Sequence, residues 1–255
     1  MGRLDNRVAL LTGGAKGIGV HYAKKLAAEG ARLMIADIVG ANDLAAEIAR
    51  QRGANSVASS VTDVSDEGAV KKLVADTIER FGRIDVVVNN AALFAPLQEQ
   101  KVLDIDVALW DRVMAVNVRG VFLVTKHVAP HMIAQKYGKI INISSGTVAR
   151  GIPNFSHYVT SKGAVTAFTR SISRELGEYN ICVNSLAPGF TLSDSVIREN
   201  PGHLAHSQRP SIARRAIKRD EYPEDLLGVL IFLASADSDF ITGQTIAVDG
   251  GANNT

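Results

Sequence analysis

Residues 8–19 read Val8-Ala-Leu-Leu-Thr-Gly-Gly-Ala-Lys-Gly-Ile-Gly19, a short apolar run followed by a turn that contains four glycines. The apolar run is typical of a buried parallel strand. A helical pattern over residues 20–29 follows the turn and closes at Gly30. A strand, a glycine-rich turn and a helix in this order are typical of a phosphate-binding turn. These flanking elements argue against an ordinary glycine-rich loop.

The glycines are spaced as a phosphate-binding turn requires. Gly13 permits a tight turn, Gly17 lets the backbone approach a pyrophosphate, and Gly19 lets the helix pack close to the strand. Lys16 and Ile18 lie between these glycines. We therefore predict that these five residues belong to the cofactor-binding site of a dinucleotide.

A second apolar run, residues 32–36, ends in Asp37, eighteen positions beyond Gly19. An acidic residue at about this spacing hydrogen-bonds the adenosine ribose hydroxyls. Its charge would repel the 2′-phosphate of NADP, so we predict NAD as the cofactor. Lys16 is the counter-argument, because a basic side chain in the turn could meet that phosphate. Capping of the following helix is the alternative role of Asp37.

Alternating strand and helix patterns continue along the whole chain without a linker, a tandem repeat or a low-complexity segment. Further strands are expected at residues 56–61, 84–88, 139–144, 181–187 and 245–248, and helices at about residues 70–81, 109–128, 158–176 and 226–233. The pattern predicts one α/β domain over residues 1–255. We expect a Rossmann-like, doubly wound parallel sheet with helices on both faces.

Residues 192–223 are expected to form a substrate lid. The stretch is polar, holds Pro201 and Pro210 and has little clean periodicity, which is typical of a functional lid or binding loop. Its basic side chains include Arg198, Arg209, Arg214, Arg215, Lys218 and Arg219. A solvated or subunit-facing surface is the favoured interpretation of that charge. Recognition of an anionic substrate is the alternative.

Composition argues against several functional classes. A net charge of +2 over 255 residues gives no argument for nucleic acid or a membrane surface. Cys182 is the only cysteine, so no intrachain disulfide is possible, and no Cys/His cluster has metal-ligand spacing. The N-terminal residues lack the apolar core of a signal peptide, and no apolar run is long enough to span a bilayer. We expect a cytoplasmic protein without a metal site.

A candidate catalytic group lies between residues 145 and 162. Tyr158 and Lys162 are four residues apart, so a helix would place both side chains on one face. The ammonium group favours the phenolate and would bring the tyrosine pKa, about 10 when unperturbed, toward the working range. Ser145 follows an apolar strand pattern, at the strand end where open α/β sheets bind ligands. Together the three groups could polarise a carbonyl and exchange a proton with it. By itself, the tyrosine–lysine pair is more often part of a solvated helix face.

The ordered set of motifs resembles the short-chain dehydrogenase/reductase family. The motifs are Thr12-Gly-x-x-x-Gly-x-Gly19, Asn89-Asn-Ala91, Asn117, Ser145, Tyr158-x-x-x-Lys162, Pro188-Gly189 and Ile241-Thr-Gly-Gln-Thr-Ile-Ala-Val-Asp-Gly250. The resemblance covers essentially the full length. It implies an NAD(P)-dependent oxidoreductase that acts on CH–OH groups. Two residues depart from the usual family pattern, Ala92 in place of glycine and Ser193 in place of threonine, and neither removes a catalytic group.

The resemblance also implies roles for individual residues. Tyr158 would be the general acid/base, assisted by Lys162, which would also bind the nicotinamide ribose. Ser145 would hold the substrate oxygen, and Asn117 would position a water in a proton relay. The remaining cofactor contacts would come from Asp63 and Val64 at the adenine, Asn90 at the adenosine, and Pro188, Gly189 and Thr191 at the nicotinamide carboxamide. Family members are commonly homotetramers, which we expect here.

The substrate class is the least determined feature of the sequence. Val148, Ile152 and Phe155 suggest a partly apolar pocket, so we expect a secondary alcohol or its ketone. A sugar or polyol and an NADP-dependent carbonyl reduction remain alternatives. A sugar-nucleotide epimerase or dehydratase is disfavoured by the glycine spacing and the short C-terminal region. A catalytically silent cofactor-binding protein is disfavoured because all four catalytic positions are filled.

Overall fold

The computed structural model describes residues 2–199 and 201–253 and has the predicted architecture. Within the described residues, one sheet of seven parallel strands has the order β3-β2-β1-β4-β5-β6-β7. Its strands are β1 (Val8–Thr12), β2 (Arg32–Asp37), β3 (Val57–Val61), β4 (Val86–Asn89), β5 (Gly138–Ile143), β6 (Ile181–Pro188) and β7 (Thr245–Val248). The doubly wound parallel sheet is therefore confirmed.

Helices connect the strands. They are α1 (Ile18–Ala28), α2 (Asn42–Arg52), α3 (Glu67–Phe81), α4 (Val107–Met114), α5 (Gly120–Gln135), α6 (Thr147–Arg150), α7 (Ser156–Leu176), α8 (Asp194–Glu199), α9 (Pro201–Arg214) and α10 (Pro223–Ala234). The π-helical turn η1 (Ala115–Arg119) joins α4 to α5, and 3-10 turns lie at Gly177–Tyr179 and Ala236–Ser238.

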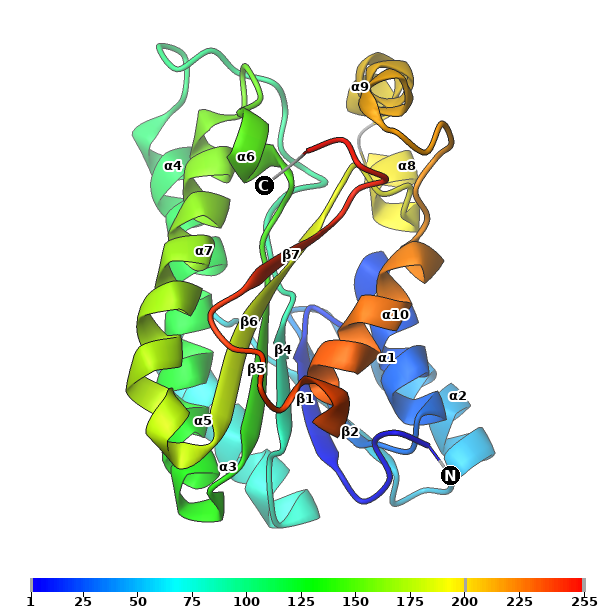
Figure 1. The fold of residues 1–255 in the computed structure, drawn as a ribbon, viewed down its shortest axis with the longest axis vertical. Coiled ribbons are helices and arrows are strands. Elements are labelled where there is room, and N and C mark those ends of the chain that lie inside the picture. Colours follow the sequence, from blue (N-terminus) through cyan, green and yellow to red (C-terminus); the bar gives the residue numbers. More distant parts are fainter. Residues whose placement is uncertain (1, 200, 254–255) are drawn as a thin grey trace.

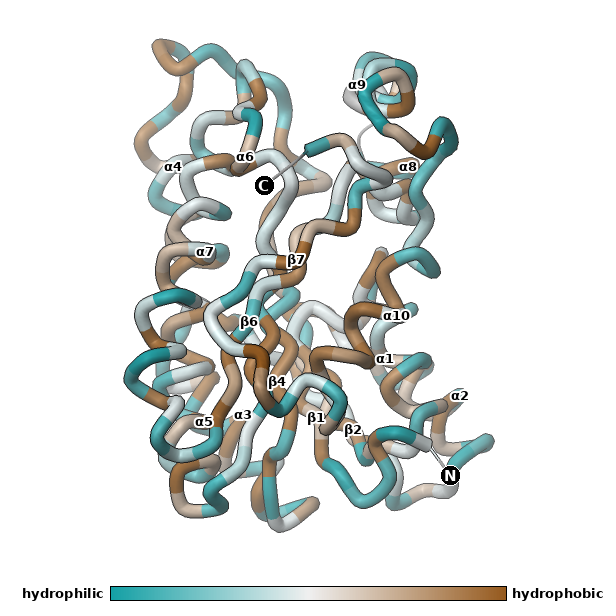
Figure 2. The backbone as a smooth tube through the Cα atoms, in the orientation of Figure 1, coloured by the Kyte–Doolittle hydropathy of each residue, from teal (hydrophilic) through white to brown (hydrophobic). Residues whose placement is uncertain are grey.

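Two layers of helices cover the sheet. Helices α1, α2 and α10 cover one face and α3, α5 and α7 the other (Figure 1). Successive residues of a strand face opposite sides, so Leu11 of β1 belongs to the core on the first face and Leu10 to the core on the second. Figure 2 shows the hydrophobic residues gathered along the central strands, with hydrophilic residues in many of the outer turns. Burial on both faces explains why these strands read as continuous apolar runs.

The strand order places a ligand-binding crevice at β1 and β4. Thr12 at the end of β1 is in register with Ala36 of β2 and with Asn89 of β4. The connections from these two neighbouring strands run to opposite sides of the sheet, so the crevice at their carboxyl ends is the topological switch point where such folds bind nucleotides.

Two sequence-based expectations need correction. Residues 192–223 are not irregular, because α8 and α9 occupy most of the stretch. α8 is only six residues long and α9 contains Pro210, so neither gave a clean period in the sequence. The helix expected over residues 109–128 is interrupted by η1, which contains Asn117. π-helical turns are frequent at functional sites.

Among the described residues, no helix is both long enough and apolar enough to cross a bilayer. The cytoplasmic location stays a prediction.

Candidate active site and cofactor site

A single cavity of about 920 Å³ contains nearly all the predicted site residues. It lies at the carboxyl ends of the strands, where the switch point places a ligand. Its wall includes Gly13, Lys16, Gly17, Ile18, Gly19, Asp37, Asp63, Val64, Asn90, Ser145, Tyr158, Lys162, Pro188, Gly189 and Thr191. Among the predicted catalytic and cofactor residues, Asn117 alone does not line it. Of the three residues predicted to form an apolar substrate pocket, Ile152 and Phe155 line the cavity and Val148 does not.

The glycine positions of the turn have no room for a side chain. Gly13 has a φ of +65°, and a Cβ there would lie 2.6 Å from the Cα of Ala91. A Cβ on Gly19 would overlap the carbonyl oxygen of Gly13, and a Cβ on Gly17 would lie 2.9 Å from the Ser195 hydroxyl. The resulting floor is bare backbone next to the start of α1, which fits the pyrophosphate of a dinucleotide.

Asn90 and Thr12 hold this turn against the end of β4. The Asn90 Nδ2 donates to the carbonyl oxygens of Thr12 at 3.1 Å and Gly13 at 2.7 Å. The Thr12 hydroxyl accepts from the backbone N–H groups of Asn90 and Ala91. Asn90 therefore braces the turn from the side, and its predicted contact with the adenosine stays a prediction.

Asp37 lies at the end of β2 with its carboxylate at the turn. Its Oδ2 accepts the N–H of Ala15 at 2.9 Å, and its Oδ1 accepts the N–H of Val39 at 3.2 Å. The N-cap of α2 is Ala41, so Asp37 does not cap that helix. The alternative structural role considered for this residue is thus wrong. Its carboxylate lies in the cavity wall, as a ribose ligand must.

Lys16 is near an acidic partner. Its Nζ lies 3.6 Å from the Glu199 Oε1 of α8, and both side chains are partly exposed. Exposed pairs of this kind are weak, so the pair lowers the positive charge of the turn without removing it.

Asp63 and Val64, in the loop after β3, line one end of the cavity, and their contact with the adenine stays a prediction. The Asp63 Oδ1 accepts hydrogen bonds from the N–H of Ser65 at 2.8 Å and from its hydroxyl at 2.7 Å. This local turn orders the loop after β3, which gives the cavity a defined wall at that end.

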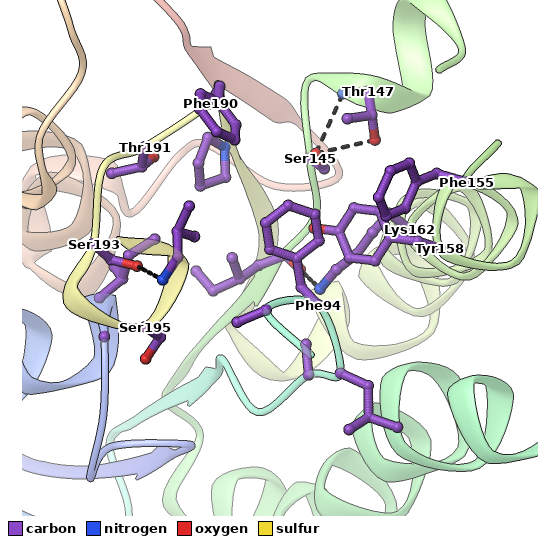
Figure 3. A pocket seen from close by; sticks show the side chains of 18 of the residues that line it. Phe94, Ser145, Thr147, Phe155, Tyr158, Lys162, Phe190, Thr191, Ser193 and Ser195 are labelled. Carbon is purple, nitrogen blue, oxygen red and sulfur yellow. Dashed lines mark hydrogen bonds between the residues drawn. The ribbon is translucent and has the colours of Figure 1, made fainter. Parts of the chain in front are cut away.

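Ser145, Tyr158 and Lys162 meet on the other side of the cavity (Figure 3). β5 ends two residues before Ser145, and α7 presents Tyr158 and Lys162 one turn apart. The Lys162 Nζ donates to the carbonyl oxygen of Ile143 at 2.7 Å and lies 5.8 Å from the centroid of the Tyr158 ring. The Phe94 ring packs on the tyrosine with centroids 4.7 Å apart.

Burial controls the protonation of this group. Desolvation raises the pKa of Tyr158 to about 12, and a hydrogen bond with Ser145 offsets part of that rise. Desolvation also lowers the pKa of Lys162 to about 8. The lowering of the tyrosine pKa that we expected from Lys162 is therefore not found in this structure. Burial is the dominant cause of the rise, and the Lys162 ammonium donates to the Ile143 carbonyl rather than to the phenol.

Asn117 is completely buried under the loop that follows β4. Its Oδ1 accepts the N–H of Leu93 at 2.7 Å, and its Nδ2 donates to the Leu93 carbonyl and to the Ser161 hydroxyl. η1 turns this amide toward α7, so Asn117 joins the loop to that helix. Its proposed place in a proton relay stays a prediction.

A buried ion pair supports the loop after β6 and could not be predicted from the sequence. The Thr191 hydroxyl donates to the Glu221 Oε1 at 2.6 Å, and the Glu221 Oε2 lies 3.2 Å from the Arg215 Nη2. Arg215 is 3% exposed, so the solvated or subunit-facing role favoured for the lid cations is wrong for this residue. Arg215 also donates to the Phe190 carbonyl. Nothing in the sequence gave reason to expect this pair, because charged residues rarely lie in the interior and are normally predicted to be on the surface.

The comparisons with known proteins agree with this geometry. A family model described as enoyl-(acyl carrier protein) reductase matches residues 13–253. A 3-oxoacyl-(acyl-carrier-protein) reductase of Thermotoga maritima is 36% identical over 98% of both chains, and a galactitol 2-dehydrogenase of Agrobacterium fabrum is 39% identical over 98% of both. The crystal structure of levodione reductase matches with a TM-score of 0.90 and 33% identity, covering 97% of this chain and 98% of that one. This protein belongs to the short-chain dehydrogenase/reductase family of oxidoreductases, which use nicotinamide cofactors.

Proposed function

We propose that this protein is an NAD-dependent oxidoreductase that interconverts a secondary alcohol and its ketone. The observation that carries the proposal is the presence of Ser145, Tyr158 and Lys162 in the same cavity as the glycine turn. A hydroxyl, a phenol and an amine thus face the place where a nicotinamide and a substrate would meet.

The side chains suit the proton half of this reaction. The nicotinamide, when bound, supplies or accepts the hydride. With its pKa raised to about 12, the Tyr158 phenol is protonated at neutral pH and can donate to a carbonyl oxygen. The Ser145 hydroxyl can hold that oxygen by a hydrogen bond, and the Lys162 charge can stabilise the phenolate that remains. Oxidation of the alcohol uses the same proton path in reverse.

Asp37 supports NAD as the cofactor. A carboxylate at the end of β2 can accept hydrogen bonds from ribose hydroxyls, whereas it would repel a 2′-phosphate. Lys16 lies beside Glu199, which offsets the cation that could otherwise attract that phosphate.

The test is a fluorescence titration of NADH and NADPH into wild type, D37A and D37N. Wild type is expected to bind NADH more tightly, and both variants are expected to lose the preference. D37N separates charge from structure, because its amide oxygen can still accept the Ala15 N–H. NADPH preference in wild type would refute the Asp37 argument, and K16Q would then show whether Lys16 provides the preference. Binding of neither nucleotide would indicate a silent fold.

A polyol dehydrogenase is the second candidate function, supported by the similarity to galactitol 2-dehydrogenase. The cavity wall favours a less polar substrate, because Phe94 and Phe155 lie next to Tyr158 and Phe190 adds a third aromatic ring beside Thr191 (Figure 3). Steady-state rates with hexitols and with aryl or alkyl secondary alcohols discriminate the two. Higher kcat/KM with the hexitols would replace the first proposal with the second.

We also propose a homotetramer in solution. Phe122 of α5 is 44% exposed and packs edge-on against Phe168 of α7, with centroids 6.4 Å apart, so this face offers apolar surface for a second copy. Light scattering that gives the mass of one chain would refute the assembly.

A further inference from the structure

Two arginines from different elements line the substrate side of the cavity. Arg150 is the last residue of α6, and Arg214 is the last residue of α9. Both are part of the cavity wall. Within residues 2–199 and 201–253, neither guanidinium makes a hydrogen bond or an ion pair. Arg214 is exposed, so water can solvate its charge, whereas Arg150 is half-buried and lacks that compensation.

The guanidinium of Arg150 is half-buried, and its Nε is shielded from solvent without a hydrogen-bond partner in the described part of the chain. Burial lowers the pKa of Arg150, and the positive charge of Arg214 lowers it further. The two cations therefore lie close enough to repel each other. An anion between them would relieve the repulsion and satisfy the shielded donor.

Neighbouring charges leave a net positive site. Arg215 is paired with Glu221, whose pKa burial raises to about 7, so its charge is only partly offset at neutral pH. Asp249 partly offsets the charge at Arg150, although its oxygens already accept from the N–H groups of Gly251, Ala252 and Asn253. Two cations and one nearby carboxylate leave about one positive charge. This balance matches a singly charged carboxylate better than a doubly charged phosphate.

The position of the arginines separates them from the cofactor's adenosine end. Asp37 ends β2, whereas α6 follows β5, and β1 and β4 lie between these strands. With about 4.8 Å between neighbouring strands, the two ends are roughly 14 Å apart. α6 begins two residues after Ser145, so Arg150 is within one short helix of the group that would hold the reacting oxygen.

We propose that the substrate carries a carboxylate and that Arg150 and Arg214 bind it together. The inference rests on the proposed function, because it assigns the other end of the substrate to Ser145 and Tyr158. The planar guanidinium of Arg150 can donate two parallel hydrogen bonds to a carboxylate, in bidentate geometry. The aromatic wall of Phe94, Phe155 and Phe190 then receives the apolar part of the same molecule.

The test uses 4-oxo-4-phenylbutanoate and 5-oxo-5-phenylpentanoate, each paired with its uncharged methyl ester. In wild type, kcat/KM is expected to be at least tenfold higher for an acid than for its ester. The ratio is expected to fall by about 10- to 100-fold in R150Q and in R214Q, the range for a lost hydrogen bond to a charged group. R209Q is the matched control, because it removes the same charge from α9 at a position outside the cavity wall.

Calorimetry of acid binding to the cofactor-loaded protein tests the carboxylate site independently of turnover. Acid binding that weakens in R150Q and R214Q but not in R209Q supports the carboxylate site whether or not turnover occurs. Turnover of no ketone at all would refute the proposed function alone. Equal binding of acids and esters across the series, or an equal loss in R209Q, would overturn the inference.

Discussion

Lys162 allows a quantitative test, because the structure predicts a pH-dependent contribution of one side chain to stability. The side chain is 3% exposed, and burial lowers its pKa from 10.5 to about 8. Between these values the unfolded chain still holds the lysine proton after the folded protein has released it. The free energy of unfolding therefore rises with pH through this window. The contribution is complete above pH 10.5 and is lost as the pH falls through about 8.

The size of the effect follows from the two pKa values. Their difference corresponds to about 3 kcal/mol in all, of which about 2 kcal/mol develops between roughly pH 7.5 and pH 10. In K162M this titration is absent, whereas the other ionisable groups titrate in both proteins. The difference in unfolding free energy, wild type minus K162M, should therefore grow by about 2 kcal/mol over that range. Loss of the hydrogen bond to Ile143 adds a constant offset that does not affect the slope.

Reversible urea unfolding of wild type and K162M at several pH values measures this difference. K101M is the control, because it removes an exposed lysine and should keep the wild-type pH dependence. Parallel curves for wild type and K162M would refute the reasoning, since they would mean that burial does not disfavour the charged amine. The expected result would show that the protein holds a charged Lys162 at neutral pH at the expense of stability, as is common for functional groups.

Three further substitutions test the site and its scaffold. Y158F keeps the ring against Phe94 but removes the proton donor, so turnover should fall by about 10²- to 10⁴-fold while fluorescence titration shows unchanged NADH affinity. G19A places a Cβ against the Gly13 carbonyl, so NADH binding should weaken by more than about tenfold. Asp85 is fully buried and accepts hydrogen bonds from a backbone N–H and two partly exposed arginines, so D85N should lower the unfolding free energy by about 2 kcal/mol.

For each of these three substitutions, one outcome would contradict the expectation. Turnover of Y158F above a tenth of the wild-type rate would assign proton transfer to another group. Wild-type NADH affinity in G19A would show that the turn can open without harm to the phosphate site. Asp85 lies outside the cavity wall, so a large loss of NADH affinity in D85N would show that the site depends on distant packing.

Much of the fold followed from local sequence patterns. Neighbouring residues in the sequence were enough to predict the strands β1 and β5 and the glycine turn of residues 13–19. Strand burial and tight turns depend on near neighbours, so a few residues carry the pattern. Tyr158 and Lys162 share a helix face through spacing alone. Asp37 was found because it ends a strand at a set distance from the glycine turn. These features are encoded by covalent distance along the chain.

Other features arose only when distant segments packed together. Arg215 looked like a surface cation until the fold brought Glu221 and the Phe190 carbonyl to it in the interior. The tyrosine pKa rises instead of falling, because desolvation depends on everything that surrounds the ring. Arg150 and Arg214 are more than sixty residues apart in the sequence, yet they line one cavity. Burial and charge proximity are properties of the folded surroundings, so no local pattern in the chain could have indicated them.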